Sequence, residues 1–335
     1  MANIVFTELE GWEEEHIKNS LPGHNITLIR RPLQNQDYDS FKKVDILSPF
    51  IYTPVTAELL EKIPDIKLIA TRSTGFDHVD IKECTKRGVR VVNVPFYGEN
   101  TVAEHTWALI LALSRKIFQS YERTEKGDFS IDGLRGFDLK GKILGVVGCG
   151  HIGQHVVKIA KAFEMKVVVF DPKPNESLAK ELGFEYHSLD ALLKEADVIT
   201  LHAPYNEKTH HILNKENMRL IKKGSVLVNT ARGGLIDTMA LIDALKDGLL
   251  AGAGLDVLEE ECGIKEESEL LSPEFQKKCD LKLLIADHVL LGRDDVIITP
   301  HNAFNSQEAI LRILDTTIDN IKAYLDGKII NEVNS

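Results

Sequence analysis

Residues 145–174 read GVVGCGHIGQHVVKIAKAFEMKVVVFDPKP, and this stretch decides the fold. Its three glycines, Gly148, Gly150 and Gly153, match the pattern G-x-G-x-x-G. An apolar strand precedes the pattern, an amphipathic helix begins within it, and a second apolar strand follows the helix. In this context the glycines predict the turn of a dinucleotide-binding βαβ unit, in which the pyrophosphate lies on the helix N-terminus.

Asp171 ends the second strand, 18 residues after Gly153. A carboxylate at this position accepts hydrogen bonds from the ribose hydroxyls and repels a 2′-phosphate. We therefore predict NAD as the cofactor, although Lys173 nearby leaves NADP open. The alternative is a βαβ unit whose glycines serve packing alone, and the complete motif in its usual order argues against it.

The composition describes a globular chain with room for two domains, because the 335 residues are 43% hydrophobic and 27% charged. A formal net charge of −11 argues against binding to nucleic acids or to an anionic membrane surface. The four cysteines are scattered without a C-x-x-C pair, and the N-terminal residues show no secretory pattern. We therefore expect reduced thiols, a cytoplasmic protein and no metal site.

The first part of the chain alternates short strands with helices. The strands are expected within NIVFTE, ITLIRR, DILSPF, LIATRST and VRVVNV, with helices near 11–20, 55–63 and 77–87. After them, apolar residues at helical spacing predict one long helix from an N-cap at Asn100, running between two domains, with His105 and Trp107 as core or interface residues. Another amphipathic helix is expected at the C-terminal end of the chain, where it returns to the first domain.

From Lys142 a second alternating series predicts a six-stranded doubly wound sheet. Its strands are KILGVVG, KVVVFD, DVITLHAP, SVLVNTA, AGAGLDV and VIITPH, with helices near 152–164, 176–182 and 241–247. The fold class is therefore α/β, with two doubly wound parallel-sheet domains. We expect a Rossmann NAD-binding domain of residues 100–301 and a discontinuous flavodoxin-like substrate domain of residues 1–99 plus 302–335.

Three polar residues follow strands of the second series: Arg232, Glu261 and His301. Because the carboxyl ends of parallel strands share one edge of a sheet, these side chains are predicted to meet in the ligand crevice. An arginine binds a carboxylate through its fixed fork of donors. A histidine exchanges protons near neutral pH, and a paired glutamate raises its pKa. Such a set beside a dinucleotide indicates hydride transfer with His301 as the acid/base.

Four blocks in this order, GCGHIG…FDP, NTARGGLID, GLDVLEEE and TPHNAF, resemble the signature blocks of the D-isomer-specific 2-hydroxyacid dehydrogenase family. The similarity covers almost the whole chain. Within the family, the segments VPFYGENTVAEH and YERTEKGDFSIDGLRGFDLKGK are most similar to the fermentative, NAD-dependent D-lactate dehydrogenases.

The resemblance assigns roles to individual residues. It implies that Arg232 is the catalytic arginine that binds substrate, that Glu261 is the partner of the histidine and that His301 is the acid/base. It also implies a substrate site in which the backbone of Thr74 and Gly75 holds the carboxylate, Tyr97 closes over the substrate and Phe304 lies near its methyl end. The implied cofactor contacts, besides the three glycines and Asp171, are His151, Ile152, Ala203, Pro204, Asn206, Thr209, Thr230, Ala231 and Asp256. For Asp256, a turn cap at the strand end is an equal alternative to a carboxamide contact.

The reaction implied is the reversible reduction of pyruvate to D-lactate by NADH. Another small 2-keto acid, such as hydroxypyruvate, glyoxylate or a branched keto acid, is the first alternative. The second is a dinucleotide-binding scaffold like the C-terminal-binding protein corepressors. Adenosylhomocysteine hydrolase shares the domain plan but not the Arg–Glu–His set. The family also implies a homodimer, for which the apolar segment 129–139 and the long helix are the candidate contacts.

Overall fold

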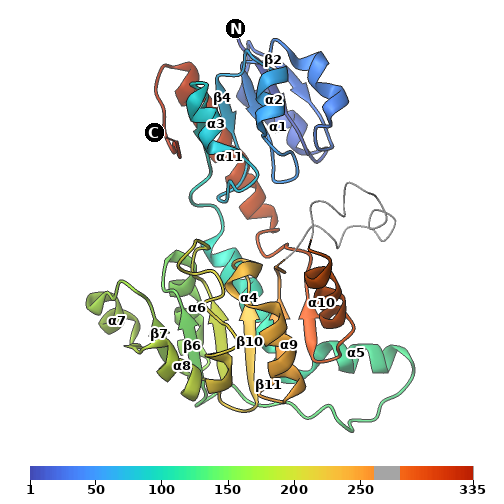
Figure 1. The fold of residues 1–335 in the computed structure, drawn as a ribbon, viewed down its shortest axis with the longest axis vertical. Helices are drawn as coiled ribbons and strands as arrows, with labels where there is room; N and C mark the ends of the chain where they lie inside the picture. Colours follow the sequence, from blue (N-terminus) through green and yellow to red (C-terminus); the bar gives the residue numbers. More distant parts are fainter. Residues whose placement is uncertain (260–279, 335) are drawn as a thin grey trace. The chain divides into compact units, whose positions relative to one another are not determined.

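The computed structural model describes residues 1–259 and 280–334. The chain divides into two compact units, one of Met1–Gly98 with Ser306–Ser335 and one of Glu99–Asn305 (Figure 1). Each unit holds one wholly parallel sheet, as the alternation of strands and helices predicts.

The first unit is built on a five-stranded sheet in the order β2-β1-β3-β4-β5. Its strands are β1 (Asn3–Phe6), β2 (Asn25–Leu28), β3 (Ile46–Ser48), β4 (Leu68–Ala70) and β5 (Arg90–Val92). Its helices are α1 (Glu13–Ser20), η1 (Asn35–Phe41), α2 (Ala57–Lys62), α3 (Ile81–Lys86) and α11 (Gln307–Leu325). The five strands expected from the sequence are all present, whereas the 3-10 helix η1 was not expected.

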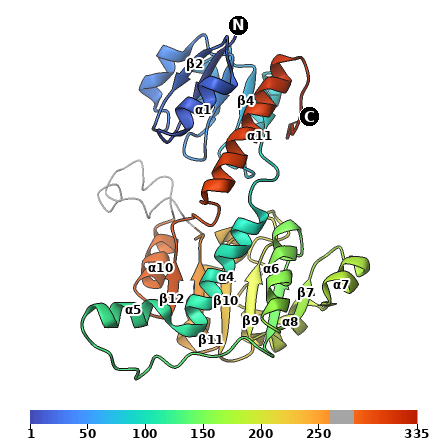
Figure 2. The same ribbon diagram turned by 180° about the vertical axis from the view of Figure 1, so that it is seen from behind.

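Alternate residues of these strands point to opposite faces of the sheet, and both faces are covered. Leu47 and Ile69 belong to one buried cluster, which includes residues of α2 and α3. Ile46 and Leu68 belong to a second cluster, which includes residues of α1 and α11. The C-terminal helix α11 therefore completes the core of the N-terminal unit, and this explains why the unit is discontinuous in sequence (Figure 2).

The second unit has a seven-stranded sheet in the order β12-β11-β10-β9-β6-β7-β8. Its strands are β6 (Ile143–Val147), β7 (Lys166–Phe170), β8 (Glu185–Tyr186), β9 (Val198–Leu201), β10 (Ser225–Asn229), β11 (Leu250–Leu255) and β12 (Val296–Ile298). The helices are α4 (Glu99–Arg115), α5 (Ile117–Glu125), α6 (His151–Ala162), α7 (Glu176–Leu182), α8 (Leu189–Glu195), α9 (Thr238–Lys246) and α10 (Leu281–Leu291), with short 3-10 turns η2 (Met218–Leu220) and η3 (Gly233–Leu235). The expectation of six strands was wrong, because the sheet has the additional edge strand β8. Its two residues are too few to show the alternation of apolar and polar residues that marks a strand.

The single long helix expected after Asn100 is two helices. Lys116 has a φ of 51°, and this left-handed residue ends α4 at Arg115 before α5 begins. Asn100 is the second residue of α4, so the expected N-cap there was also wrong. Trp107 lies in the core as the sequence suggested, 3% exposed and stacked on Phe163 with ring centroids 4.9 Å apart.

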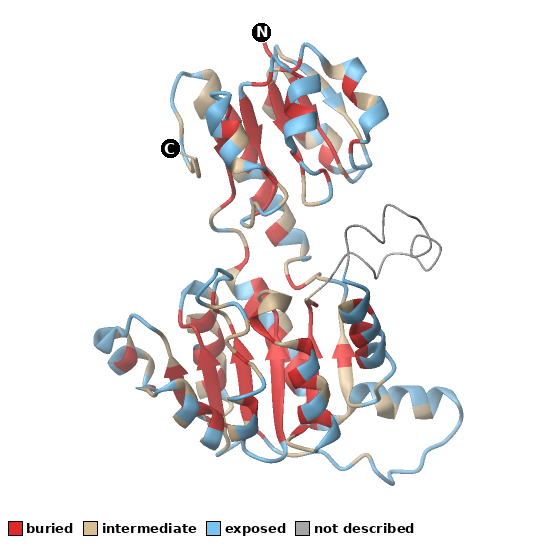
Figure 3. Cartoon of the chain, viewed as in Figure 1, coloured by how far each residue is buried: buried red, intermediate tan, exposed pale blue. Residues whose placement is uncertain are grey.

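The strands of the second unit are its most buried elements (Figure 3). All run parallel, so all end at one edge of the sheet, and most of the sequence-predicted residues of this unit follow these strand ends. Within the described part of the chain, no helix combines the length and apolar character needed to cross a bilayer.

Candidate active site

In the glycine turn between β6 and α6, close contacts within the chain explain two of the three glycines. Gly148 has a φ of 92°, and a Cβ there would lie 2.8 Å from the nitrogen of Ala203. A Cβ on Gly153 would lie 2.4 Å from the carbonyl oxygen of Gly148, so the helix packs directly on the turn. At Gly150, the N-cap of α6, a Cβ would meet no atom within 4 Å. The space above Gly150 is therefore open where an anion would approach the helix N-terminus.

Asp171 follows β7 and is bonded to the same turn. Its Oδ2 accepts a hydrogen bond of 3.0 Å from the backbone N–H of Cys149, and its Oδ1 accepts one of 2.9 Å from Lys173. Each oxygen keeps a lone pair that can accept from a ribose hydroxyl. Cys149 is buried, and burial raises the pKa of its thiol to about 11, so it stays protonated and serves packing.

The loop after β9 carries Ala203, Pro204, Asn206 and Thr209, and it is bonded internally. The hydroxyl of Thr209 donates to the carbonyl of Pro204 over 2.6 Å, and the N–H of Asn206 donates to that hydroxyl over 2.8 Å. At the start of the loop, burial lowers the pKa of His202 to about 3, so this imidazole is neutral at physiological pH. The loop therefore offers a fixed and mostly neutral surface beside the glycine turn.

Asp256, one residue past β11, is fully buried and supports the turn that carries His301. Its Oδ1 accepts the hydroxyl of Thr299 over 2.5 Å and the N–H of Asn302 over 3.0 Å, and its Oδ2 accepts the N–H of Ala303 over 2.9 Å. His301 itself has a φ of 51°, an unusual conformation for a residue with a Cβ. The Asp256 carboxylate thus binds residues on both sides of His301, a side-chain hydroxyl before it and two backbone N–H groups after it.

The pKa of Asp256 follows from these bonds. Burial alone would raise it, but the hydrogen bonds from His105, Thr299, Ala303 and Asn302 outweigh burial and hold it below its ordinary value of 3.8. His105 of α4, expected only as a core or interface residue, lies 3.1 Å from the Thr299 hydroxyl and 3.4 Å from the carboxylate. Asp256 therefore caps the turn that carries His301, and its contact with the cofactor carboxamide stays a prediction.

Arg232 lies in the loop that follows β10. The side chain of Asn229, at the end of that strand, donates to the Arg232 carbonyl over 2.9 Å and accepts from the N–H of Ala231 over 3.0 Å. The hydroxyls of Thr230 and Thr106 lie 2.8 Å apart, which ties this loop to α4. The position of Arg232 is thus determined by the strand end before it.

The strands that precede Arg232, Asp256 and His301 are β10, β11 and β12, and these are neighbours in the sheet. Their carboxyl ends therefore bring a guanidinium, a buried carboxylate and an imidazole to the same edge of the sheet, whereas the predicted set had Glu261 in place of Asp256. Glu261, the predicted partner of His301, lies outside the described residues. A guanidinium and an imidazole that follow neighbouring strand ends have the chemistry to bind an anion and to exchange a proton.

The predicted carboxylate-binding backbone of Thr74 and Gly75 lies in the first unit, after β4. The Thr74 hydroxyl donates to the carbonyl of Val94 over 2.6 Å, and the Ser73 hydroxyl donates to the carbonyl of Gly75 over 2.6 Å. Next to this loop, the guanidinium of Arg72 is buried and donates to three backbone carbonyls, of Ser48, Thr7 and Glu8. Burial lowers the pKa of Arg72, although Glu13 and Glu8 act against it.

Two further predicted substrate residues, Tyr97 and Phe304, belong to different units. Tyr97 follows β5 in the first unit, where its carbonyl accepts from the guanidinium of Arg312. Phe304 belongs to the second unit and follows the His301 turn. Their meeting with Arg232 and His301 around one substrate stays a prediction.

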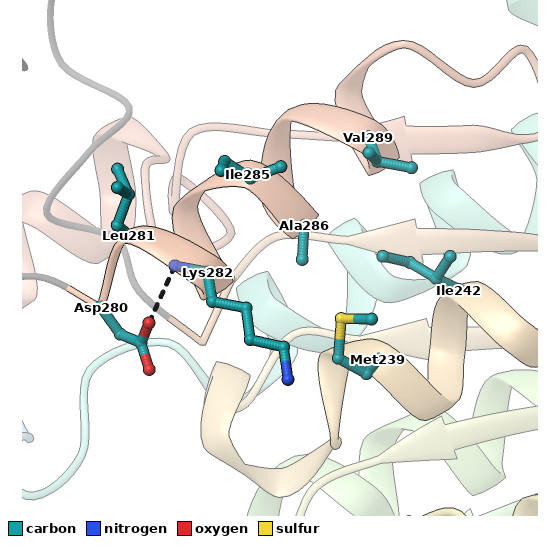
Figure 4. A pocket seen from close by; sticks show the side chains of 8 residues that line it. All are labelled: Met239, Ile242, Asp280, Leu281, Lys282, Ile285, Ala286 and Val289. Atoms are coloured by element: carbon teal, nitrogen blue, oxygen red, sulfur yellow. Dashed lines mark hydrogen bonds between the residues drawn. The ribbon is translucent and has the colours of Figure 1, made fainter.

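An apolar groove between α9 and α10 is separate from these residues (Figure 4). Met239 and Ile242 of α9 face Leu281, Ile285 and Val289 of α10, and none of the described site residues predicted from the sequence lines it. Among the described residues, no three His, Cys, Asp or Glu side chains are grouped as metal ligands would be. His210 and His211 are stacked on one another with centroids 3.8 Å apart.

Comparison with known proteins gives a consistent result. The model of the D-isomer specific 2-hydroxyacid dehydrogenase NAD-binding domain matches residues 107–303. D-lactate dehydrogenase from Escherichia coli is 39% identical over 82% of this chain and 80% of that protein. Glyoxylate reductase from Korarchaeum cryptofilum is 35% identical over 96% of this chain and 88% of that protein. A crystal structure of D-lactate dehydrogenase from Aquifex aeolicus, complexed with NAD and lactic acid, is 38% identical, covers 99% of both chains and has a TM-score of 0.86.

These matches confirm the two-domain α/β fold and NAD as the cofactor. The residues described here fit that cofactor, because the open space above Gly150 adjoins a helix N-terminus and the Asp171 carboxylate adjoins the same turn. Asp171 also disfavours a 2′-phosphate at the end of β7.

We expect Gly150→Ala to raise the Kd for NADH by about 10- to 100-fold, because a methyl group above the helix N-terminus displaces charge-assisted hydrogen bonds of about 1.5–3 kcal/mol. Fluorescence titration of NADH measures the change. Gly292→Ala is the matched control, since its φ is −81° and its new Cβ would lie 3.6 Å from the nearest atom. An unchanged Kd in Gly150→Ala would place the pyrophosphate elsewhere.

We expect Asp256→Asn to lower the free energy of unfolding at pH 7 by about 1–3 kcal/mol, because an amide cannot accept all of these donors. The pKa of Asp256 is lower in the folded chain, so its stabilisation is present above pH 3.8 and is lost as the pH falls below that value. Urea unfolding measured across this pH range should show that the free energies of unfolding of the variant and the wild type become equal at acid pH. A difference that does not depend on pH would contradict the assignment.

Proposed function

Because the chain belongs to the D-isomer-specific 2-hydroxyacid dehydrogenase family, we propose that it is an NAD-dependent D-lactate dehydrogenase that reduces pyruvate reversibly. The observation that carries the proposal is the placement of Arg232, Asp256 and His301 after three neighbouring parallel strands. Relatives named D-lactate dehydrogenase, one of them seen with lactic acid, support pyruvate as the substrate.

Each residue has one task in the proposed reaction. Arg232 binds the carboxylate and the keto oxygen of pyruvate through its fork of donors, and the backbone of Thr74 and Gly75 binds the carboxylate. NADH supplies the hydride that arrives at the keto carbon. His301 donates the proton to the developing alkoxide, so pyruvate, NADH and one proton give D-lactate and NAD. Glu261 is assigned as the partner of His301, and Tyr97 and Phe304 as the residues over the substrate and at its methyl end.

The cofactor assignments follow the same strand edge. His151 and Ile152, the first residues of α6, are assigned to the phosphates together with the glycine turn. The loop of Ala203, Pro204, Asn206 and Thr209 is assigned to the adenine–ribose side, and Thr230, Ala231 and Asp256 to the nicotinamide side. In the two-domain assignment, residues 100–301 bind NAD and residues 1–99 plus 302–335 bind the keto acid.

A second candidate is reduction of glyoxylate or hydroxypyruvate by the same residues. It is favoured by the glyoxylate reductase of Korarchaeum cryptofilum, which aligns with 96% of this chain. Arg232 and His301 would have the same roles, and only the residues around the group that replaces the methyl of pyruvate would differ, which is a hydrogen in glyoxylate and a hydroxymethyl group in hydroxypyruvate. A dinucleotide-binding scaffold is the third candidate, and it predicts NADH binding without turnover.

We expect purified protein to oxidise NADH faster with pyruvate than with hydroxypyruvate, glyoxylate or branched 2-keto acids. His301→Gln should lower kcat for pyruvate by about 100- to 10,000-fold while NADH still binds, because the proton donor is lost. His187→Gln, which removes an imidazole paired with Glu195 in the same unit, is the matched control. A faster rate with another keto acid would change the substrate, and NADH binding without any turnover would favour the scaffold.

We also propose a cytoplasmic homodimer. α5 and the segment after it extend from the sheet of the second unit (Figure 1). They expose apolar side chains, of which Phe129 is 79% and Ile131 is 82% exposed, with Phe118 and Tyr121 on α5 also exposed. Such a set of exposed apolar residues is typical of an interface. The free cysteines Cys84 and Cys149 are both buried, which suits a reducing compartment.

Light scattering after size-exclusion chromatography should give twice the mass of one chain. Replacing Phe129 and Ile131 by serine should shift the equilibrium toward monomers, because the apolar area is no longer removed from water. Replacing Ile330, which is 43% exposed in the other unit, by serine removes an apolar side chain outside this segment and should leave the mass unchanged. A wild-type mass of one chain at micromolar concentration would rule out the dimer.

A further inference from the structure

Glu259, which the sequence analysis did not single out, has a nearly buried carboxylate with three donors. Its Oε1 lies 2.5 Å from Nε2 of His211, and the two side chains are 10% and 31% exposed. Its Oε2 accepts the hydroxyl of Thr238 over 2.7 Å and the N–H of Thr238 over 3.2 Å. One carboxylate thus joins the segment after β11 to two other loops.

The first of these loops leads from the predicted cofactor contacts Ala203–Thr209 to His211. The His211 imidazole stacks on His210, whose Nδ1 lies 3.1 Å from the hydroxyl of Tyr205. The backbone N–H of His211 donates to the carbonyl of Gly234 over 2.9 Å. His211 adopts a φ of 49°, a strained conformation that its bonds to Glu259 and Gly234 hold in place. A shift of the Glu259 carboxylate would therefore also move His211 and the loop that carries the predicted cofactor contacts, which we call the cofactor loop.

The second loop is the one that carries Arg232. Thr238, at the start of α9, ends this loop and is bonded to Glu259. At Gly233, directly after Arg232, a Cβ would lie 1.9 Å from the carbonyl oxygen of Leu258, so the Leu258–Glu259 backbone lies against the Arg232 loop. The carboxylate thus holds the far end of this loop while Asn229 holds its beginning.

We propose that the Glu259–His211 pair is a positioning device that couples the cofactor loop to the Arg232 loop. The inference rests on the proposed function, because it takes Arg232 to bind the keto acid. Removing either partner leaves the other polar group without its hydrogen bond in a partly buried position, so the two loops would move away from their fixed geometry. Small displacements of an orienting group cost large factors in the rate of a reaction between bound reactants.

The test compares Glu259→Gln, His211→Gln and the double variant with wild type. Glu259→Gln keeps the size of the side chain and an acceptor for Thr238 but removes the charge. Glu195→Gln is the matched control, because Glu195 lies 2.5 Å from Nδ1 of His187 in the same unit and contacts neither loop described above. Thermal unfolding, the Kd for NADH, and KM and kcat for the keto acid that wild type reduces fastest are measured for each.

We expect kcat to fall about 10- to 100-fold in each single variant, because the displaced Arg232 orients the substrate less well. The rise in KM should be smaller, because Arg232 still binds the substrate carboxylate. The Kd for NADH should rise in both. The double variant should resemble the single variants, since either change breaks the same pair. Glu195→Gln should lower the unfolding temperature at most and leave Kd, KM and kcat unchanged.

The proposal is overturned if the folded Glu259→Gln protein keeps kcat and the Kd for NADH within about twofold of wild type, or if the effects of the two single changes multiply in the double variant. Failure of the proposed function looks different, because wild type itself would then reduce no keto acid. In that case the Kd for NADH alone tests the role of the Glu259–His211 pair. This Kd should still rise in both single variants, and the increase in the double variant should be no larger than in either single variant.

Discussion

The hydrogen bonds accepted by the buried Asp256 carboxylate support the rest of the site. Without them, the N–H groups of Asn302 and Ala303 would lose their acceptor, and the turn that holds His301 in its left-handed conformation would be weakened. The carboxylate lies at the end of β11, between the strands that precede Arg232 and His301. A single side chain therefore links the end of the sheet to the backbone turn that carries His301.

Much of this arrangement could be predicted from local sequence. The glycine motif, the apolar strand before it and Asp171 after it lie within 30 residues, so their pattern is visible without a fold. Arg232 and His301 are far apart in sequence, but a parallel sheet places all strand ends on one edge, and this rule was enough to group them. The alternation of strands and helices along the chain predicted both sheets, apart from the two-residue strand β8.

Other features depend on contacts that no periodicity records. The break at Lys116 rests on one left-handed residue within an otherwise helical pattern. The pairs of His105 with Thr299 and of His211 with Glu259 join segments 194 and 48 residues apart. These residues support loops and do not stand directly after a strand, where a reactive side chain would be noticed. The sequence therefore offered no signal beyond the presence of the histidines and the glutamate. Glu259 has no pattern of its own in the sequence, since Glu261, two residues later, is the glutamate that matches the family.

The measurement that tests the account most directly follows the hydride. Wild-type protein is given pyruvate and NADH that carries deuterium at both C4 positions, and the lactate is analysed by mass spectrometry and chiral chromatography. The account predicts D-lactate with one deuterium, bound to C2, since the hydride passes directly from the cofactor to the keto carbon while the proton comes from the protein. L-lactate, lactate without deuterium, or no lactate at all would contradict it.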